Sequence, residues 1–472
     1  MEKKSILVIG AGVVGTLIAR EISKLNCQIS VFEKLPDVGW GITKANSGII
    51  HAGYGDNPNS NRAKYCTKGN ALYKYLSEEL QFEFKRIGSL VLSFNEMQEK
   101  TLYELHEQGK LNGVEGLEIL NKEKTLSMEP SVNPLVKKAL FAPSAGIVAP
   151  WEIAIAAFEN SKENRANYFF NTEVKRFFKQ GKKVIVETNS GIFEFDFVIN
   201  ASGIFSDEIA LKSGMNVHKI YPRKGEYILL DENELVRKII FPTPGEKGKG
   251  ILVVPTVHDT TLLGPTAEDL PDTMKENTET TFHGLSKIIE QAKKLVPEID
   301  LSKTIRTFAG LRPENAVHDF DVSYGEYFVN LLAIRSPGLT AAPAIAREVA
   351  DFVKEKFSLK ANRNFTPTRD RIISIKNLSN SEKEKIIGDN PSFGNIVCRC
   401  NKVTEGEVIE AIKRGAITID GIKFRTLATF GRCQGSFCLA NIMKIISREL
   451  GIPLNEIEKN SKGSKILNGE VK

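Results

Sequence analysis

SILVIGAGVVGTLIAREISKLNCQISVFEK, residues 5–34, decides the fold of this chain. An apolar run leads into a G-x-G-x-x-G turn formed by Gly10, Gly12 and Gly15, and a helical stretch and a second apolar run ending at Glu33 follow. Such glycines permit a tight turn, let backbone amides approach a pyrophosphate at a helix N-terminus, and allow close packing of helix on strand. Glu33 is placed to accept hydrogen bonds from an adenosine ribose. The stretch therefore predicts a dinucleotide-binding α/β domain.

Length and composition are those of a multidomain globular protein. The 472 residues are 41% hydrophobic and 26% charged, enough for about two or three domains. The net charge of +6 is spread along the chain without a dense basic tract, which argues against nucleic-acid binding but is compatible with a basic pocket for an anionic substrate. No apolar stretch approaches the roughly twenty residues of a membrane helix, and the N-terminus enters the first strand too soon for a signal peptide. We expect a cytoplasmic protein that contacts membranes only through a partner.

The organisation along the chain is mixed. A glycine-rich, polar stretch after Glu33 reads as a ligand-facing loop and is followed by a helical run over 63–80. Strand-like pieces at 89–94, 183–188 and 226–230 alternate with helices and suggest a sheet-containing substrate region. Strand, small-residue turn and helix recur at 195–210 and 327–353, so we expect the nucleotide domain to be assembled from separated stretches. The fold class is α/β with an inserted α+β substrate region.

Four of the six cysteines cluster near the C-terminus: Cys398, Cys400, Cys433 and Cys438. Reduced thiols in this number suit a metal better than disulfides in a chain without a secretory signal. The four cysteines alone are compatible with a zinc site, an iron-sulfur cluster or free thiols. The predicted dinucleotide site at the other end of the chain favours the cluster. Glycine-containing turns and helix ends beside the thiols would point backbone amides at cluster sulfurs. Cys27 and Cys66 fit small buried apolar residues instead.

Further motifs resemble those of the D-amino-acid-oxidase-type FAD enzymes, and among these the FAD-dependent glycerol-3-phosphate dehydrogenases. The motifs are NSGIIHAGY (46–54), VINASG (198–203), PRKGEY (222–227), GPTAED (264–269), AGLRPE (309–314) and SPGLTAAPAIA (336–346). The cysteine segment resembles the bacterioferritin-associated ferredoxin-like 2Fe-2S domain at the C-terminus of anaerobic glycerol-3-phosphate dehydrogenase catalytic subunits. Its second pair is spaced C-x4-C, whereas stand-alone ferredoxins of this type have C-x-x-C.

The resemblance implies that FAD occupies the nucleotide site and that the thiols hold a 2Fe-2S cluster. It places part of the NSGIIHAGY loop beside the isoalloxazine ring. Backbone amides where SPGLTAAPAIA opens a helix could stabilise negative charge on the reduced flavin. The FAD-binding residues implied beyond the first turn are Asn46, Ser47, Gly48, Ala201, Gly203, Gly310, Ser336, Gly338, Leu339 and Thr340.

Two histidines are candidates for contact with substrate. Oxidation of a secondary alcohol needs a base for the hydroxyl proton, and an imidazole with an unperturbed pKa of about 6.5 can serve near neutral pH. His51 lies in the expected flavin loop and is the predicted base, with local packing and a covalent flavin link as the alternatives. His258 is a second candidate for substrate contact, with a satisfied surface histidine as its alternative.

Arg312 is the predicted catalytic anion clamp. A guanidinium offers paired planar donors for phosphate or carboxylate, and the preceding glycine would bring this backbone close to the flavin. The alternative is an ordinary ion pair with Glu314 or a neighbour. Arg223 and Lys224 could add positive field, although charged turns are usually solvated.

The sequence thus predicts four segments: an oxidoreductase over 1–357, a linker over 358–393, a small helical 2Fe-2S domain over 394–452 and a tail over 453–472. The resemblance implies oxidation of sn-glycerol 3-phosphate, with electrons leaving through the cluster to a second flavoprotein or a quinone-linked membrane anchor. Two readings compete with it. A 2-hydroxyglutarate or amino-acid dehydrogenase or oxidase is one, and an electron-transfer subunit without its own substrate is the other.

Overall fold

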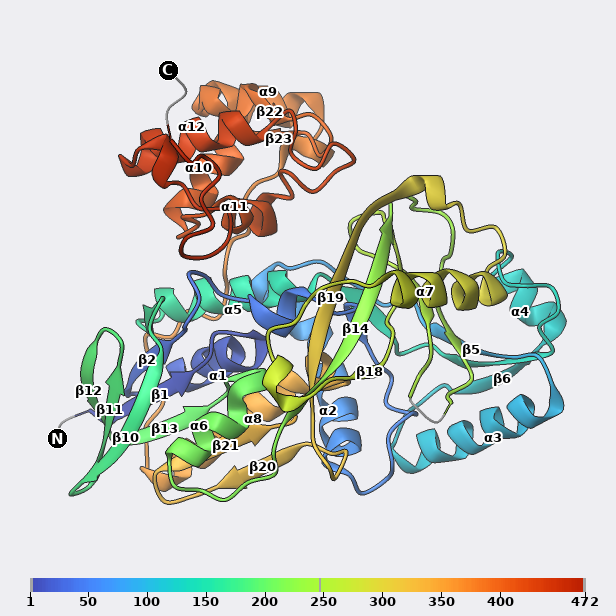
Figure 1. The fold of residues 1–472 in the computed structure, drawn as a ribbon, viewed down its shortest axis with the longest axis horizontal. Helices are drawn as coiled ribbons and strands as arrows, with labels where there is room; N and C mark the ends of the chain where they lie inside the picture. The colour runs from blue at the N-terminus through green and yellow to red at the C-terminus, as the bar shows by residue number, and fades with distance from the viewer. Residues whose placement is uncertain (1–2, 246–247, 470–472) are drawn as a thin grey trace.

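The computed structural model describes residues 3–245 and 248–469 (Figure 1). Its first body is a six-stranded sheet in the order β20-β21-β13-β1-β2-β9, parallel from β21 to β9 and antiparallel at the β20 edge. The strands are β1 (Ser5–Ile9), β2 (Gln28–Phe32), β9 (Asn167–Phe169), β13 (Phe197–Asn200), β20 (Asp321–Tyr324) and β21 (Phe328–Leu332). Since β13 and β21 come from far along the chain, the predicted assembly from separated stretches is confirmed.

Both faces of this sheet are covered, which explains why β1 is apolar throughout. Ile6 and Val8 pack in one core with the helices, whereas Leu7 and Ile9 pack in another with a small antiparallel sheet. The helices are α1 (Val13–Ser23), α2 (Asn61–Leu80), α5 (Pro150–Glu163) and α8 (Gly338–Lys356). The small sheet and its neighbouring helix are β10 (Val174–Gln180), β11 (Lys183–Thr188), β12 (Gly191–Phe195) and α6 (Ser206–Lys212).

The second body is a nine-stranded mixed sheet that contains two of the three strands predicted for the substrate region, at 89–94 and 226–230. The third, at 183–188, is β11 of the small sheet on the first body, because its alternating apolar residues pack against β1 instead. The long antiparallel pair of the second body, β14 (Tyr221–Leu230) and β19 (Thr304–Glu314), reaches toward the first body (Figure 1). The other strands are β5 (Ser89–Ser93), β6 (Glu118–Asn121), β7 (Lys138–Ala142), β15 (Ile239–Pro242), β16 (Leu252–Pro255), β17 (Thr261–Gly264) and β18 (Glu268–Asp269). Its helices are α3 (Glu96–Leu111), α4 (Lys122–Met128) and α7 (Phe282–Leu295). A three-stranded sheet of β3 (Ile49–Ile50), β8 (Gly146–Val148) and β4 (Phe84–Lys85) includes part of the 46–54 stretch.

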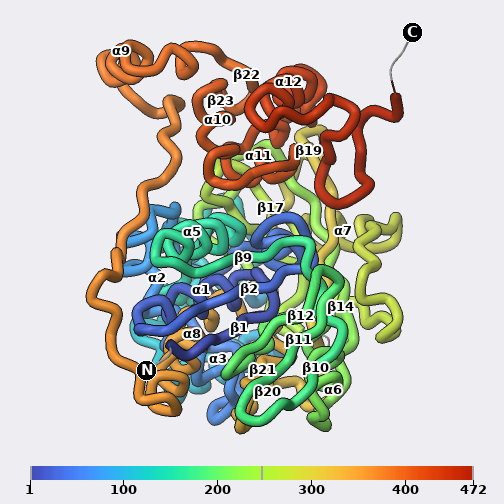
Figure 2. The backbone as a smooth tube through the Cα atoms, turned by 90° about the vertical axis from the view of Figure 1, so that its left-hand side faces the viewer, coloured from blue at the N-terminus to red at the C-terminus, as the bar shows by residue number. Residues whose placement is uncertain are grey.

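The C-terminal body is small and mainly helical, and it lies over α5 (Figures 1 and 2). It contains α9 (Asn380–Asp389), β22 (Ile396–Cys398), β23 (Val403–Thr404), α10 (Glu405–Lys413), α11 (Ile419–Thr426) and α12 (Leu439–Leu450). Two segments differ from the prediction. The predicted linker contains helix α9, which begins with a capping box formed by Ser379 and Glu382. The polar composition of the segment had not indicated a helix. The tail is packed, because Ile457 is fully buried in the core of this body.

The rest of the linker runs along the side of the first body (Figure 2). Backbone amides of Asn362 and Thr366 donate to Lys24 and Asn164, and the Arg369 guanidinium pairs with Glu159 at 2.6 Å. None of the described helices is both long and apolar enough to cross a membrane.

Candidate active site

The glycine turn between β1 and α1 has the close approaches that its motif predicts. Gly10 adopts φ +98°, and a Cβ there would lie 2.6 Å from the Ala201 carbonyl oxygen. A Cβ on Gly15 would lie 1.9 Å from the Gly10 carbonyl oxygen. Gly12 caps α1 without a side-chain hydrogen bond to the first turn. The residues present therefore fit a dinucleotide, because the turn admits no side chain and the α1 N-terminus presents amides to an anion.

Glu33 ends β2 beside this turn. Its carboxylate oxygens accept hydrogen bonds from the backbone N–H of Ala11 at 2.8 Å and of Leu35 at 2.9 Å, and burial raises its pKa. Each oxygen accepts one of these bonds, which leaves acceptor capacity for ribose hydroxyls. Glu33 lines the cavity described next, and its contact with ribose stays a prediction.

Two cavities meet at the glycine turn. The first, about 850 Å³, contains most of the predicted FAD-binding residues: Gly10, Gly12, Glu33, Asn46, Ser47, Gly48, Ala201, Gly203 and Gly310. The second, about 860 Å³, contains His51, Arg312, Ser336, Gly338 and Leu339. Their walls share Gly12, Asn46, Ser47, Ala201 and Gly203. A long ligand can therefore run from the turn past the 46–48 loop toward His51 and Arg312.

The loop shared by both cavities is held by its own side chains. The Asn46 amide donates to the carbonyl oxygens of Ile42 and Thr43, and its Oδ1 accepts the Gly48 N–H at 2.9 Å. On the opposite strand, a Cβ on Gly310 would lie 1.9 Å from the Ala45 carbonyl oxygen. The AGLRPE glycine therefore lets β19 approach this loop closely and brings Arg312 to the second cavity.

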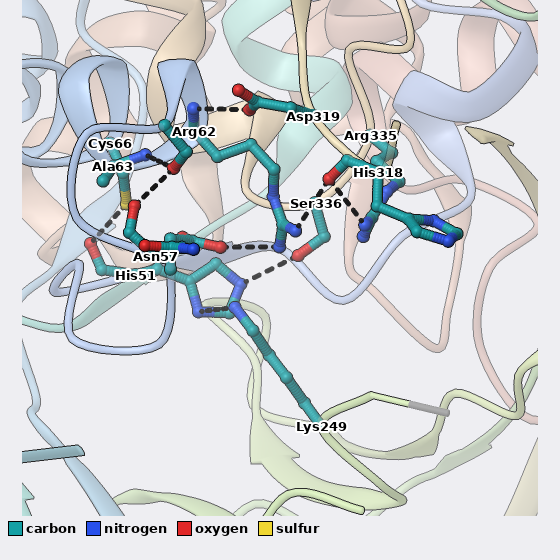
Figure 3. A network of polar contacts seen from close by, with 12 residues as sticks. His51, Asn57, Arg62, Ala63, Cys66, Lys249, His318, Asp319, Arg335 and Ser336 are labelled. Atoms are coloured by element: carbon teal, nitrogen blue, oxygen red, sulfur yellow. Dashed lines mark hydrogen bonds and ion pairs between the residues drawn. The ribbon is translucent and has the colours of Figure 1, made fainter. Parts of the chain in front are cut away.

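His51 lies between two long polar contacts in the second cavity (Figure 3). Its Nδ1 is 3.5 Å from Lys249 Nζ, and its Nε2 is 3.4 Å from Ser336 Oγ. Burial, followed by the nearby Lys249 and Arg62 cations, holds the pKa of His51 well below its usual range. The imidazole is therefore uncharged at neutral pH and able to accept a proton.

Arg312 presents a cation without a counter-ion. Its guanidinium donates to the backbone carbonyl oxygens of Arg223 (3.3 Å), Lys224 (3.4 Å) and Thr266 (2.5 Å). Within the described ranges no carboxylate pairs with it, and burial lowers its pKa. The predicted alternative, an ion pair with Glu314, is taken by Arg223 at 2.9 Å and Arg335 at 2.8 Å instead. Its charge is therefore available to an anion in the cavity.

The whole second cavity is basic. Its walls carry six cationic side chains and, in the part of the chain that the structure describes, no aspartate or glutamate: Arg62, Arg223, Lys249, Lys287, Arg312 and Arg335. Sequence reasoning missed four of these, at positions 62, 249, 287 and 335, because they come from α2, α7 and two separate loops with no shared spacing. Lys224, a predicted contributor, is buried and pairs with Glu226 and Glu268, while Arg223 pairs with Asp269.

His258 and Thr340 occupy different places from those their predicted roles suggest. His258 lines the first cavity, where its Nε2 pairs with Glu152 at 3.0 Å and its ring stacks on Trp151, so it is not brought together with His51 and Arg312. Thr340 is fully buried behind the wall, and its hydroxyl accepts the backbone N–H of His51 at 2.9 Å. A role for Thr340 would therefore be to position His51.

The four clustered thiols form two pairs. Cys400 and Cys433 have sulfurs 3.6 Å apart, and Cys398 is hydrogen-bonded to Cys438. Backbone N–H groups of Cys400, Asn401 and Thr429 point at the Cys398 sulfur. Among the described residues no group of three or more ligands converges on a single ion. Four thiols in two pairs suit a 2Fe-2S cluster, in which each of two iron atoms takes two thiolates.

The loop that leads to Cys433 forms part of the wall of the first cavity. Phe430 and Phe424 of the C-terminal body line that cavity together with Trp151, with ring centroids 6.0 and 5.3 Å from the indole. The residue after Phe430 is Gly431, and a Cβ there would lie 2.4 Å from Cys400 Cβ. The exposed Cys400 therefore packs against the residue that follows the cavity-lining Phe430.

Comparison with known proteins agrees with this geometry. Residues 5–352 match the family model of FAD dependent oxidoreductases (DAO), and residues 396–448 match that of the BFD-like [2Fe-2S] binding domain. A glycerol 3-phosphate dehydrogenase of Caloramator mitchellensis is 43% identical over 99% of this chain and 98% of its own length. The structure of FAD-bound L-alpha-glycerophosphate oxidase from Mycoplasma pneumoniae superposes with a TM-score of 0.73 at 31% identity, covering 78% of this chain and 99% of that one. Human mitochondrial L-2-hydroxyglutarate dehydrogenase is 27% identical over 75% of this chain and 89% of its length.

Proposed function

The chain belongs to the FAD dependent oxidoreductase family, and from this premise we propose that it oxidises sn-glycerol 3-phosphate to dihydroxyacetone phosphate. It is a flavoenzyme whose cofactors are FAD and the 2Fe-2S cluster of its BFD-like domain. The predicted fold, enzyme class and cofactors are thereby confirmed.

The observation that carries the substrate proposal is the unpaired Arg312 in the second cavity, whose walls hold six cations and no acid among the described residues. Three of these cations pair with carboxylates that do not line the cavity: Arg62 with Asp56, and Arg223 and Arg335 with Glu314. A phosphate monoester has a charge of about −1.5 to −2 near neutral pH and suits such a site. An amino-acid substrate would bring an ammonium group among these cations and be repelled. The names of two relatives, the dehydrogenase at 43% identity and a Mycoplasma pneumoniae oxidase at 32%, specify glycerol 3-phosphate as the compound that those proteins oxidise.

The residues divide the reaction into binding and proton transfer. When bound, FAD supplies a hydride acceptor. Arg312 holds the phosphate through charge-assisted hydrogen bonds and so fixes the secondary alcohol relative to His51. As the carbon loses its hydride, His51 accepts the hydroxyl proton on a ring nitrogen, and the alcohol becomes a ketone. Burial, supported by the Lys249 and Arg62 cations, lowers the pKa of His51 and keeps the imidazole unprotonated between turnovers.

We further propose that the electrons leave one at a time through the cluster to a protein or quinone-linked acceptor. The support is that Phe430 lines the first cavity and that the next residue, Gly431, packs closely against Cys400. A second flavoprotein or a membrane-anchor subunit is the proposed acceptor, which would recruit a cytoplasmic enzyme to the membrane. A pure electron carrier would need neither His51 nor the unpaired Arg312.

A second candidate substrate is L-2-hydroxyglutarate. Two carboxylates also suit a basic cavity, and the human enzyme of that name is similar over 75% of this chain.

Anaerobic reduction of the flavin, followed by loss of its visible absorbance, tests these assignments. We expect sn-glycerol 3-phosphate to bleach the band fastest in parallel samples with L-2-hydroxyglutarate and a set of amino acids. Bleaching by L-2-hydroxyglutarate alone would make that compound the substrate in place of glycerol 3-phosphate. If no compound bleaches protein that holds intact FAD and cluster, the result would favour an electron-transfer subunit without its own substrate. A Cys433→Ser variant tests the electron exit: flavin bleaching should persist while reduction of an external acceptor protein is lost, and unchanged acceptor reduction would contradict it.

A further inference from the structure

The seam between the C-terminal body and the first body lies over α5 and the loop that precedes Asn46 (Figure 2). A bidentate ion pair holds the two bodies together, with Arg425 nitrogens 2.5 and 2.8 Å from the Asp37 carboxylate oxygens. Trp40 and Phe424 meet edge to face across the seam, with ring centroids 5.9 Å apart. One end of the first cavity opens between these contacts, lined by Asp420, Phe424 and Lys459 of the C-terminal body.

Two cations that have no counter-ion among the described residues, Lys44 and Arg306, line this end of the cavity. A third, Lys423, lies behind the wall, and Lys44 and Lys423 approach the same ring, with Nζ 5.7 and 6.0 Å from the centre of Phe424. Lys44 comes from the loop before Asn46, Arg306 from β19, and Lys423 from α11. Lys423 is only 4% exposed. Within the described ranges none of the three forms an ion pair or hydrogen bond. The acids nearby are already engaged, since Asp37 pairs with Arg425 and Asp420 accepts from Lys459 at 2.9 Å.

Aromatic faces compensate these charges only in part. Lys44 Nζ lies 3.7 Å from the centre of the Trp40 ring, and Lys423 Nζ lies 5.2 Å from that of Phe430. Burial nevertheless lowers the pKa of Lys44 to about 8 and that of Lys423 to about 7. Unpaired buried cations are costly, and an anion bound among them would remove that cost.

We propose that this seam is a binding site for a phosphate-type dianion, either inorganic phosphate or a phosphate monoester, held by Lys44 and Arg306 of the oxidoreductase body and Lys423 of the C-terminal body. A tetrahedral dianion can accept hydrogen bonds from cations that converge from three elements. The diphosphate of FAD has its own cradle at the α1 N-terminus, formed by Gly10, Gly12 and Gly15. The family match that defines FAD binding ends at residue 352, before Lys423. An occupant of the seam would join the two bodies.

The test measures phosphate binding by isothermal titration calorimetry to full-length protein loaded with FAD and cluster. An Arg312→Met background weakens the competing anion site in the second cavity, where five other cations remain. At constant ionic strength set with chloride, we expect saturable binding of phosphate that Lys423→Met weakens by about tenfold or more. The matched control is Lys413→Met, an exposed lysine on α10 in the same body, which should leave the affinity unchanged. Arg306→Gln, on the other side of the seam, should repeat the loss if Lys423→Met fails to fold.

Three results would overturn the site: no saturable binding, equal affinity in the Lys423 and Lys413 variants, or binding only to FAD-free protein, which would assign these cations to FAD. Glycerol 2-phosphate, which has no secondary alcohol, replaces inorganic phosphate in a parallel titration. Tighter binding of the ester would identify a phosphate monoester as the ligand, and tighter binding of the inorganic ion would identify free phosphate. Because neither Lys423 nor Lys413 lines the second cavity, the difference in affinity between their variants is independent of the proposed substrate.

Discussion

The two cavities that meet at Asn46 bind their ligands by different means. The first is shaped by backbone: glycines whose Cβ atoms would collide with carbonyl oxygens, and a helix N-terminus without a side-chain cap. The second is shaped by side-chain charge, with six cations that come from distant parts of the chain. A backbone site should fail completely when one Cβ is added, whereas a charged site should lose function in graded steps.

The largest effect is expected for Gly15→Ala in the first cavity. The new Cβ would lie 1.9 Å from the Gly10 carbonyl oxygen, so the turn must open and the FAD cradle is lost. We expect purified protein without flavin, measured by its visible absorbance. The control is Gly388→Ala on α9, where nothing lies within 4 Å. It should retain FAD and gain about 0.5–1 kcal/mol of stability. Full FAD content in the Gly15 variant would contradict the backbone account.

His51→Gln should have the next largest effect, and FAD should remain bound. Loss of the base is expected to slow substrate-driven flavin reduction by about 10²–10⁴-fold. In the unmodified enzyme the pKa of His51 is held below 6.5, so the base stays unprotonated as pH falls through that value. The rate should therefore decline only at lower pH. A rate that already halves near pH 6.5 would exclude His51 as the base.

Arg312→Met should weaken substrate use by roughly 2–4 kcal/mol, about thirty- to a thousandfold in kcat/KM. Much of this should appear as a higher KM, because the guanidinium binds the part of the substrate that does not react. Arg312→Lys serves as the matched variant and should restore part of the loss, since it keeps the charge without the paired donors. If steady-state kinetics show an unchanged KM in both variants, Arg312 does not bind the anionic group of the substrate.

Lys249→Met should give the smallest change, a displacement of the pH profile. Removing this cation leaves burial and Arg62 to hold the pKa of His51 down, so that pKa rises toward its usual value. The acid limb of the flavin-reduction rate should move to higher pH. Lys287→Met is the control, because Lys287 lines the same cavity but is not among the charges that act on His51. An acid limb that moves equally in both variants would argue against a specific Lys249 effect.

Local sequence was sufficient for the elements whose physics is local. The strand, glycine turn and helix of residues 5–34 appear as predicted, because steric limits on φ and helix packing act within a few residues. The same holds for helix α2 and strand β11. Helix α9 was not predicted, because its segment has a polar composition and its capping box was not considered. The burial of Ile457 was not predicted either, because this apolar residue stands between polar neighbours in a terminal segment.

By itself, the sequence determined the dinucleotide cradle, the thiol set and the candidacy of His51 and Arg312. Only the tertiary structure decided which charges share a cavity. Glu314 stands two residues from Arg312, yet it pairs with Arg223 and Arg335, and this leaves Arg312 free for an anion. The tertiary structure also decided that His258 lies away from His51 and that Lys249 lies next to His51. It brought three unpaired cations close together at the seam. Electrostatic interactions depend on distance and burial, and folding alone sets both.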